Sequence, residues 1–330
     1  MRAIGAVGGL PISDPGSLVE LERPVPQLRA RDVLVAVQAV SVNPVDVKLR
    51  AAMQPGAAPR VLGFDAAGVV EAVGPQVTTL GVGDEVWYAG DIGRAGADAD
   101  LQAVDERIVA ERPGTVSFAE AAALPLTAIT AWESLFGHLG LERDSTGTLL
   151  VIGGAGGVGS ILIQLATKIP GLRVVATASR RESRDWVAGL GAHAVIDHHD
   201  LVNEGLRAAP DGVDYVFSTH SQGNVEAFAQ LMNPFGHIVA IDDPVGLDLM
   251  PLKPKSIAWH WEFVFTRSMF ETEDMQEQKR ALARMAALVD EGRIRSTVTE
   301  TIEDFSAAGL RRAHALVESG RMTGKVVVTR

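Results

Sequence analysis

The stretch that decides the fold is Val151-Ile152-Gly153-Gly154-Ala155-Gly156-Gly157-Val158-Gly159-Ser160. The apolar run at 149–152 predicts a buried strand, and residues 161–166 continue with a helical pattern. Three of the glycines fit the spacing G-x-G-x-x-G, and such a turn lets backbone N–H groups and a helix N-terminus approach a pyrophosphate. The stretch therefore predicts a dinucleotide site, made by Gly154, Ala155, Gly156, Gly157, Val158 and Gly159.

The end of the next predicted strand, 173–178, indicates which dinucleotide binds. It is followed by Ser179-Arg180-Arg181, where an NAD site would carry an acid for the ribose 2′-hydroxyl. A hydroxyl and two cations suit a 2′-phosphate instead. The alternative is a solvated helix start, but cations are disfavoured at a helix N-terminus unless an anion binds there. We expect NADPH, with Ser179 and Arg180 at its 2′-phosphate and Arg181 as a further candidate.

The composition excludes several classes of protein. The 330 residues are 47% hydrophobic and 22% charged, with a net charge of -11, and no dense basic block points to nucleic acid. The chain has no cysteine, which excludes disulfides, thiolate metal sites and a cysteine nucleophile, and fits a reducing cytoplasm. Residues 1–11 are interpreted as a first strand, not a signal peptide, and no apolar run approaches a membrane span.

The pattern along the chain predicts two domains. Residues before about 115 form short strands at 33–37, 68–73 and 85–88, followed by a capping box, Ser117 to Glu120, that opens a helix. From 149 to 241, strands alternate with helices joined by short connections, which predicts a doubly wound parallel α/β sheet. The predicted strands are 149–152, 173–178, 194–197, 214–217 and 237–241, and the helices are 157–168, 183–190 and 224–232. The C-terminal strands and helix are expected to return to the first domain.

Several motifs, in register along the chain, carry a family resemblance. They are SVNPVD at 41–46, LGFDAAGVV at 62–70, VGDEV at 82–86, AAALPLTA at 121–128 and AGGVGS at 155–160. Together they resemble the medium-chain dehydrogenase/reductase superfamily, in its zinc-free quinone oxidoreductase branch. Residues 196–198, 241–244 and 261–270 are similar to a bacterial subgroup labelled "zinc-binding alcohol dehydrogenase family". The resemblance implies a GroES-like β-rich catalytic domain at 1–124 and 265–330, a Rossmann domain at 125–264, and a homodimer.

The residues argue against the zinc in that label. Zinc-dependent relatives use a Cys where this chain has Asn43, and Gly-His-Glu where it has Gly63-Phe64-Asp65. Among the histidines only His198 and His199 are adjacent, and neighbouring residues of a strand point to opposite faces. We therefore expect no zinc site with convergent ligands.

The resemblance also implies roles for two residues near the nicotinamide. It places Asn43 at the cofactor or substrate and Thr130 toward the carboxamide. From the residues alone, Asn43 is equally well a turn residue that bonds local backbone, and Thr130 a helix-interior hydroxyl. Asp65 is interpreted as a structural carboxylate that accepts backbone N–H groups.

Further positions are candidates for the nucleotide and the substrate. His198 stands where relatives carry a tyrosine near the adenosine phosphate, while Ser218 and Ile241 lie at the carboxyl ends of predicted strands, where such sheets hold ligands. Tyr88, Phe263 and Phe265 are candidates for an apolar substrate wall, with plain core as the alternative.

These expectations combine into one function. The chain is expected to transfer hydride from NADPH to an electrophilic carbonyl, a quinone or an α,β-unsaturated aldehyde or ketone, without zinc. Two alternatives stay open at this point: a zinc-free alcohol or aldehyde oxidoreductase, and a non-catalytic NADPH-binding sensor.

Overall fold

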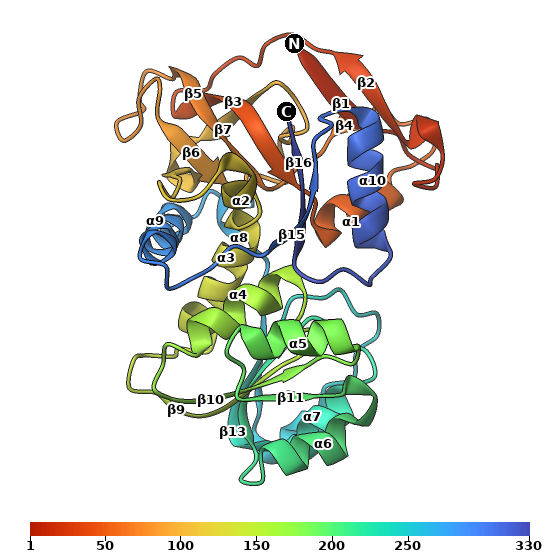
Figure 1. Ribbon diagram of the computed structural model, residues 1–330, viewed down its shortest axis with the longest axis vertical. Coiled ribbons are helices and arrows are strands. Elements are labelled where there is room, and N and C mark those ends of the chain that lie inside the picture. Colours follow the sequence, from red (N-terminus) through yellow and green to blue (C-terminus); the bar gives the residue numbers. More distant parts are fainter. The chain divides into compact units, whose positions relative to one another are not determined.

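The computed structural model describes residues 1–330 and contains two compact units (Figure 1). One comprises Met1–Ile129 and Phe265–Arg330, and the other comprises Thr130–Val264. The sequence placed the boundary at residue 124, whereas the structure places it inside helix α3 (Pro125–Trp132). The C-terminal segment belongs to the first unit, because its strands complete that unit's sheet.

The first unit is built on a seven-stranded sheet with the order β15-β16-β3-β5-β6-β8, in which β7 also pairs with β3. Its strands are β3 (Asp32–Ser41), β5 (Ala66–Val73), β6 (Glu85–Tyr88), β7 (Leu101–Asp105), β8 (Ala110–Glu111), β15 (Val298–Ile302) and β16 (Lys325–Thr329). A smaller sheet has the order β2-β1-β4, from β1 (Arg2–Ala6), β2 (Leu18–Glu22) and β4 (Arg60–Val61). The helices of this unit are α1 (Pro44–Ala52), α2 (Phe118–Ala122), α8 (Thr266–Met269), α9 (Glu277–Asp290) and α10 (Ala307–Glu318).

Strand β16 joins the two ends of the chain. It pairs antiparallel with β3, with Val327 opposite Ser41 and Val328 opposite Val40. Apolar Val326, Val327 and Val328 are buried, which stabilises this return of the chain. The same pairing carries Lys325, the first residue of β16, to the end of β3 that precedes helix α1.

The second unit contains a six-stranded sheet whose pairs are all parallel. Its order is β11-β10-β9-β12-β13-β14, from β9 (Thr146–Val151), β10 (Gly171–Thr177), β11 (Ala194–Ile196), β12 (Val213–Ser218), β13 (Met232–Ala240) and β14 (Ala258–Trp261). The chain therefore starts at β9, moves outward to β11, and then returns past β9 to β12. This is the doubly wound Rossmann order, and the direction reverses between β9 and β12.

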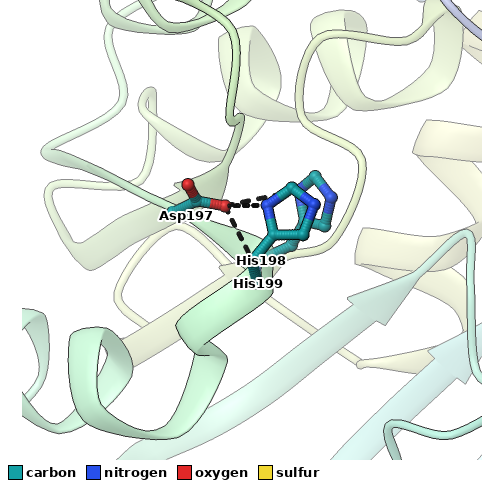
Figure 2. Close-up of side chains that lie close together, drawn as sticks. All are labelled: Asp197, His198 and His199. Atoms are coloured by element: carbon teal, nitrogen blue, oxygen red, sulfur yellow. Dashed lines mark hydrogen bonds and ion pairs between the residues drawn. The ribbon is translucent and has the colours of Figure 1, made fainter.

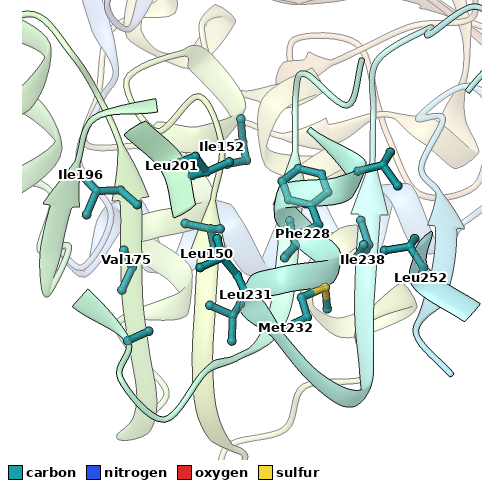
Figure 3. Packing of buried hydrophobic residues seen from close by; sticks show 14 residues of the cluster. Leu150, Ile152, Val175, Ile196, Leu201, Phe228, Leu231, Met232, Ile238 and Leu252 are labelled. Atoms are coloured by element: carbon teal, nitrogen blue, oxygen red, sulfur yellow. The ribbon is translucent and has the colours of Figure 1, made fainter. Parts of the chain in front are cut away.

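Helices cover both faces of this sheet (Figure 1). They are α4 (Gly157–Ala166) and α5 (Arg181–Gly189) on one face, and α6 (Leu201–Ala208) and α7 (Val225–Leu231) on the other. Figure 3 shows part of the core, where Phe228 and Leu231 of α7 pack with Leu150 and Ile238 of the strands. The predicted parallel α/β class is confirmed.

The sequence missed two elements of this unit. Helix α6 was not predicted, because Asn203 and Gly205 lower its intrinsic helix propensity. Packing overrides that weakness: a Cβ on Gly205 would lie 2.8 Å from a side-chain carbon of Leu231, so the glycine allows α6 to approach α7 closely. Strand β14 lies in a segment that is rich in aromatic residues and that was not predicted as a strand. It forms because it pairs in parallel with β13 at the edge of the sheet.

Candidate functional site

The glycine turn between β9 and α4 is held by the neighbouring strand. The N–H of Gly153 donates to Thr177 Oγ1 at 2.9 Å, and the N–H of Gly154 donates to the Thr177 carbonyl at 3.2 Å. Gly153 has φ +77°, a left-handed conformation, and a Cβ there would lie 2.2 Å from Thr219 Oγ1. The turn thus requires glycine at 153 in order to fit between β10 and the end of β12.

Two other glycines differ in the space around them. A Cβ on Gly159 would lie 2.4 Å from the Gly153 carbonyl oxygen, so Gly159 is required for close packing of α4 on the turn. Gly156, the N-cap residue of α4, would place a Cβ no nearer than 3.5 Å to that oxygen. Nothing in the fold itself therefore requires glycine at 156. The N–H groups of the first turn of α4, beginning at Gly157 and Val158, have no partners within the helix.

The turn lies at the carboxyl end of β9, at the reversal point of the sheet. The end of β10 lies beside it and leads into Ser179 and Arg180, both of which are half-buried; Arg180 is the N-cap residue of α5. Arg181 is 96% exposed and has Asp185 at 3.9 Å. Arg184, which the sequence analysis did not single out, donates to the carbonyls of Ala178 (3.0 Å) and Val195 (2.9 Å) and so ties the ends of β10 and β11 together.

Ser218 and Ile241 also lie at this edge. Ser218 is buried, its hydroxyl accepts from the N–H of His220 at 3.2 Å, and its carbonyl accepts from the N–H of Ile241 at 3.0 Å. Ser221, not singled out from the sequence, donates both its N–H (2.6 Å) and its hydroxyl (2.7 Å) to Asp242. These bonds fix the two loops that follow β12 and β13.

The two adjacent histidines lie differently from what the sequence predicted. The expectation that His198 and His199 diverge is wrong, because the strand ends at Ile196 and both residues lie in a short 3-10 helix, His198–Asp200. Their rings lie with centroids 4.1 Å apart and are tilted by 34° to each other, and both approach Asp197 (Figure 2). His198 Nδ1 lies 4.0 Å from Asp197 Oδ1, and His199 Nδ1 lies 2.7 Å from the same oxygen.

In the first unit, Asn43 belongs to a buried polar cluster with Asp65 and Lys325. Its amide Nδ2 donates to Asp65 Oδ2 at 3.0 Å and to the Ser41 carbonyl at 3.4 Å, and its Oδ1 accepts from the Lys325 ammonium. Lys325 Nζ also lies 3.0 Å from Asp65 Oδ2. Asn43 is 1% exposed. The Asn43 amide therefore bonds both members of the Lys325–Asp65 ion pair, in addition to the local backbone bond expected of a turn residue.

Asp65 has the structural role expected of it, since its Oδ1 accepts from the N–H of Leu126 at 2.9 Å. Burial raises the pKa of Asp65, and the Lys325 ammonium opposes that rise. Burial also raises the pKa of the neighbouring Asp46 to about 6, although its carboxylate accepts from the N–H groups of Asn43 (2.8 Å) and Gly63 (3.0 Å). Burial, with the Asp46 charge as a second cause, raises the pKa of Asp98 well above its ordinary value.

The remaining candidates divide by exposure. Tyr88 and Phe265 are each 1% exposed, and the Phe265 ring packs edge-on against Phe64 with centroids 5.4 Å apart. Phe263 is 45% exposed. Thr130 is buried in α3, and the hydroxyl of the weaker candidate Thr127 donates to the Leu124 carbonyl at 2.9 Å. Of the three proposed wall residues, only Phe263 presents substantial surface.

Lys325 is the main residue that sequence reasoning missed. A weak signal was present: a lysine opens the apolar run Lys325–Thr329, and a charged residue there needs a partner if it is buried. The identity of that partner was not visible, because Asp65 lies 260 positions away.

Comparisons with known proteins agree with this architecture. A family model described as alcohol dehydrogenase GroES-like domain matches residues 29–132, and one described as zinc-binding dehydrogenase matches residues 190–328. The chain belongs to the medium-chain dehydrogenase/reductase superfamily and is an oxidoreductase of that type. Its first unit is the GroES-like domain and its second the Rossmann domain.

Several proteins are similar to this chain over most of its length. A zinc-type alcohol dehydrogenase-like protein of Staphylococcus aureus is 42% identical over 94% of this chain and 93% of its own. An NADPH-dependent alkenal/one oxidoreductase of Arabidopsis thaliana chloroplasts is 32% identical over 92% of this chain and 73% of its own. A Rhizobium etli crystal structure, described as a candidate zinc-dependent alcohol dehydrogenase, is 48% identical with a TM-score of 0.95, over 100% of this chain and 98% of its own. No helix of this chain is both long and apolar enough to cross a membrane.

The zinc in some of these names does not fit the residues of the Asn43 cluster. At the positions that the sequence motifs align with zinc ligands, the structure holds an amide, Asn43, and a phenyl ring, Phe64, beside the carboxylate of Asp65. An ammonium group donates to both oxygen-bearing side chains, and a dication beside it would be repelled. Zinc prefers imidazole, thiolate and carboxylate ligands. The oxygens of Asn43 and Asp65 are instead the acceptors of the Lys325 ammonium.

Proposed function

We propose that this protein transfers hydride from NADPH to a quinone or an α,β-unsaturated aldehyde or ketone, without a catalytic zinc. The observation that carries the proposal is the buried Lys325 ammonium on Asn43 and Asp65. Without a Lewis acid there, an alkoxide has no metal to stabilise it. An electron-poor acceptor requires no such help, and the Arabidopsis relative is named for NADPH and for alkenals and alkenones.

The turn residues of the second unit fit the dinucleotide. Residues 154–159 make a turn at the reversal point of a parallel sheet, and space above Gly156 is not taken by the fold. We propose that the N–H groups of Gly157 and Val158 donate to the pyrophosphate. Ser179 and Arg180, at the end of the adjacent strand, suit the 2′-phosphate, with His198 and the loops that begin at Ser218 and Ile241 completing the nucleotide site.

When bound, NADPH supplies the hydride to the electrophilic carbon of the acceptor. The contribution of the chain is to hold the reactants and to exclude water. Asn43 and Thr130 have the roles that the resemblance implies, at the nicotinamide. For Asn43 the Lys325–Asp65 pair supports a positioning role, because it fixes the amide rotamer through both amide ends. The carbonyl oxygen then takes a proton from water.

Steady-state assays with the purified chain test the proposal. Benzoquinone, phenanthrenequinone and an alkenone are offered with NADPH or NADH, with and without a strong chelator. We expect oxidation of NADPH that the chelator does not change and that NADH supports less well. Loss of activity in chelator would contradict the absence of catalytic zinc.

Two other outcomes would replace the proposal. Oxidation of simple alcohols with NADP that survives the chelator, without quinone or alkenone reduction, would identify a zinc-free alcohol oxidoreductase. Tight NADPH binding with no turnover across the panel would identify a sensor.

A further inference from the structure

We propose that Asp197, His198 and His199 form a binding site for a divalent transition cation, with Zn²⁺ as the expected ion. The site is separate from the Asn43 cluster and lies on the other unit. The observation is convergence: each of the three side chains offers a ligand atom, and these atoms all lie within 4.8 Å of one another (Figure 2).

The local backbone produces this convergence. Strand β11 ends at Ile196, and Asp197 caps the following 3-10 helix by accepting the N–H of His199 at 3.0 Å. The tight helical turn places both imidazoles on the side of the carboxylate, with their rings close together and tilted to each other. In a continued strand the two rings would have pointed to opposite faces.

The charges around the site favour a cation. The Asp197 carboxylate accepts the N–H of His199 at 3.0 Å, and its Oδ1 lies 2.7 Å from His199 Nδ1. The N–H of Asp197 donates to Glu204 at 2.6 Å, which places a second carboxylate behind the first. Asp200 lies in the same turn, while Arg207, 3.7 Å from Glu204 and 3.9 Å from Asp200, is the cation that partly balances these acids.

The ligand types select the class of ion. Two imidazole nitrogens and one carboxylate oxygen suit Zn²⁺, Co²⁺, Ni²⁺ and Cu²⁺, whereas Mg²⁺ and Ca²⁺ prefer oxygen ligands alone. Three protein ligands leave further coordination positions for water, because His198 and His199 are 48% and 72% exposed. The site therefore takes an ion from solvent without unfolding of the chain.

The location gives the site a consequence for the nucleotide. Thr177 of β10 lies opposite Ile196 of β11, so the ion would bind at the edge that carries Ser179 and Arg180. An imidazole bound to the ion is not available to a phosphate. Competition between Zn²⁺ and NADPH at His198 rests on the proposed function, whereas cation binding itself does not.

The test uses the full chain without an affinity tag and without nucleotide, so that it is independent of the proposed function. Zn²⁺ is titrated by calorimetry, and Co²⁺ is titrated with its visible d–d absorption as a spectroscopic report of imidazole ligation. We expect one site per chain, weakened at least about tenfold in His198→Ala and in His199→Ala. Asp197→Asn, which keeps the capping bond, is expected to weaken binding as well, and His193→Ala and His220→Ala serve as matched controls.

Three results would overturn the site. One is unchanged Zn²⁺ affinity in both His198→Ala and His199→Ala. Another is an equal loss in the control variants, which would place the ion elsewhere. The third is displacement of Co²⁺ by Mg²⁺ at similar concentration, which would contradict the class of ion. Thermal unfolding of each variant without metal shows whether the substitution has destabilised the overall fold.

Discussion

The ammonium nitrogen of Lys325 lies 3.0 Å from Oδ2 of Asp65, and both side chains are almost fully buried. The same nitrogen donates to Oδ1 of Asn43, so one cation holds a carboxylate and an amide together. The pair thus connects the C-terminal strand β16 to the loops that precede β5 and α1. The cluster includes Asn43 and Asp65, two of the positions at which the motif resemblance aligns this chain with the ligands of zinc-dependent relatives.

Removal of either Lys325 or Asp65 should lower the free energy of unfolding. In Lys325→Met the buried Asp65 carboxylate loses its cation, and in Asp65→Asn the ammonium loses its anion. Each single variant is expected to lose about 3–5 kcal/mol of unfolding free energy. The double variant should lose less than the sum of the two, with a coupling of roughly 0.5–3 kcal/mol, measured by urea unfolding. Strictly additive losses would show that the contact contributes no coupling energy.

Substitutions at two glycines of the turn should separate an effect on cofactor affinity from an effect on stability. In Gly156→Ala the methyl group has room within the fold, so the thermal midpoint should change little while NADPH and NADH both bind at least about tenfold more weakly. In Gly159→Ala the methyl group meets the Gly153 carbonyl oxygen, and the midpoint should fall as well. Full NADPH affinity in Gly156→Ala would argue against a pyrophosphate at this turn.

Arg180 should discriminate between the two nicotinamide cofactors. Arg180→Ala is expected to weaken NADPH about 10- to 100-fold, the loss of a charged hydrogen bond, with NADH nearly unchanged. Arg173→Ala, at the opposite end of the same strand, where the guanidinium bonds only the Ala208 carbonyl, is the control. The dissociation constants of NADPH and NADH for both variants are measured by nicotinamide fluorescence. Equal weakening of NADPH and NADH in Arg180→Ala would refute the 2′-phosphate assignment.

The buried His314 should make stability depend on pH. Burial, aided by the Arg50 charge, lowers the pKa of His314 from 6.5 to about 3, and neither ring nitrogen has a hydrogen-bond partner. The fold prefers the neutral ring, so its stabilisation is complete above pH 6.5 and is lost as pH falls toward 3. From pH 7 to pH 5 the loss is about 2 kcal/mol, at about 1.4 kcal/mol per pH unit below 6.5.

A comparison of wild type with His314→Leu isolates this effect. Asp46 acts in the opposite direction, because its pKa is raised from 3.8 to about 6 and the fold gains stability as pH falls through that window. Both proteins retain Asp46, so it cancels in the difference. The variant should gain about 2 kcal/mol relative to wild type between pH 7 and pH 5 in urea unfolding. Parallel stability curves would contradict a neutral buried ring.

The sequence by itself determined the features that depend on short-range order. The strand, glycine turn and helix around residues 149–166 follow from apolar periodicity and from glycine's freedom at Gly153, where φ is positive. The capping box at Ser117 and Glu120 formed as predicted, since its bonds span three residues. Alternation of strand and helix then required a parallel sheet, because short crossovers allow little else.

Only the tertiary structure decided which distant polar groups meet. Asn43 and Lys325 lie 282 positions apart, and their contact exists because β16 pairs with β3 in one register. Likewise, the point at which β11 ends, one residue before Asp197, decided whether two histidines diverge or converge. Local patterns reflect propensities that act over a few residues, whereas register, strand ends and burial are set by the packing free energy of the whole unit.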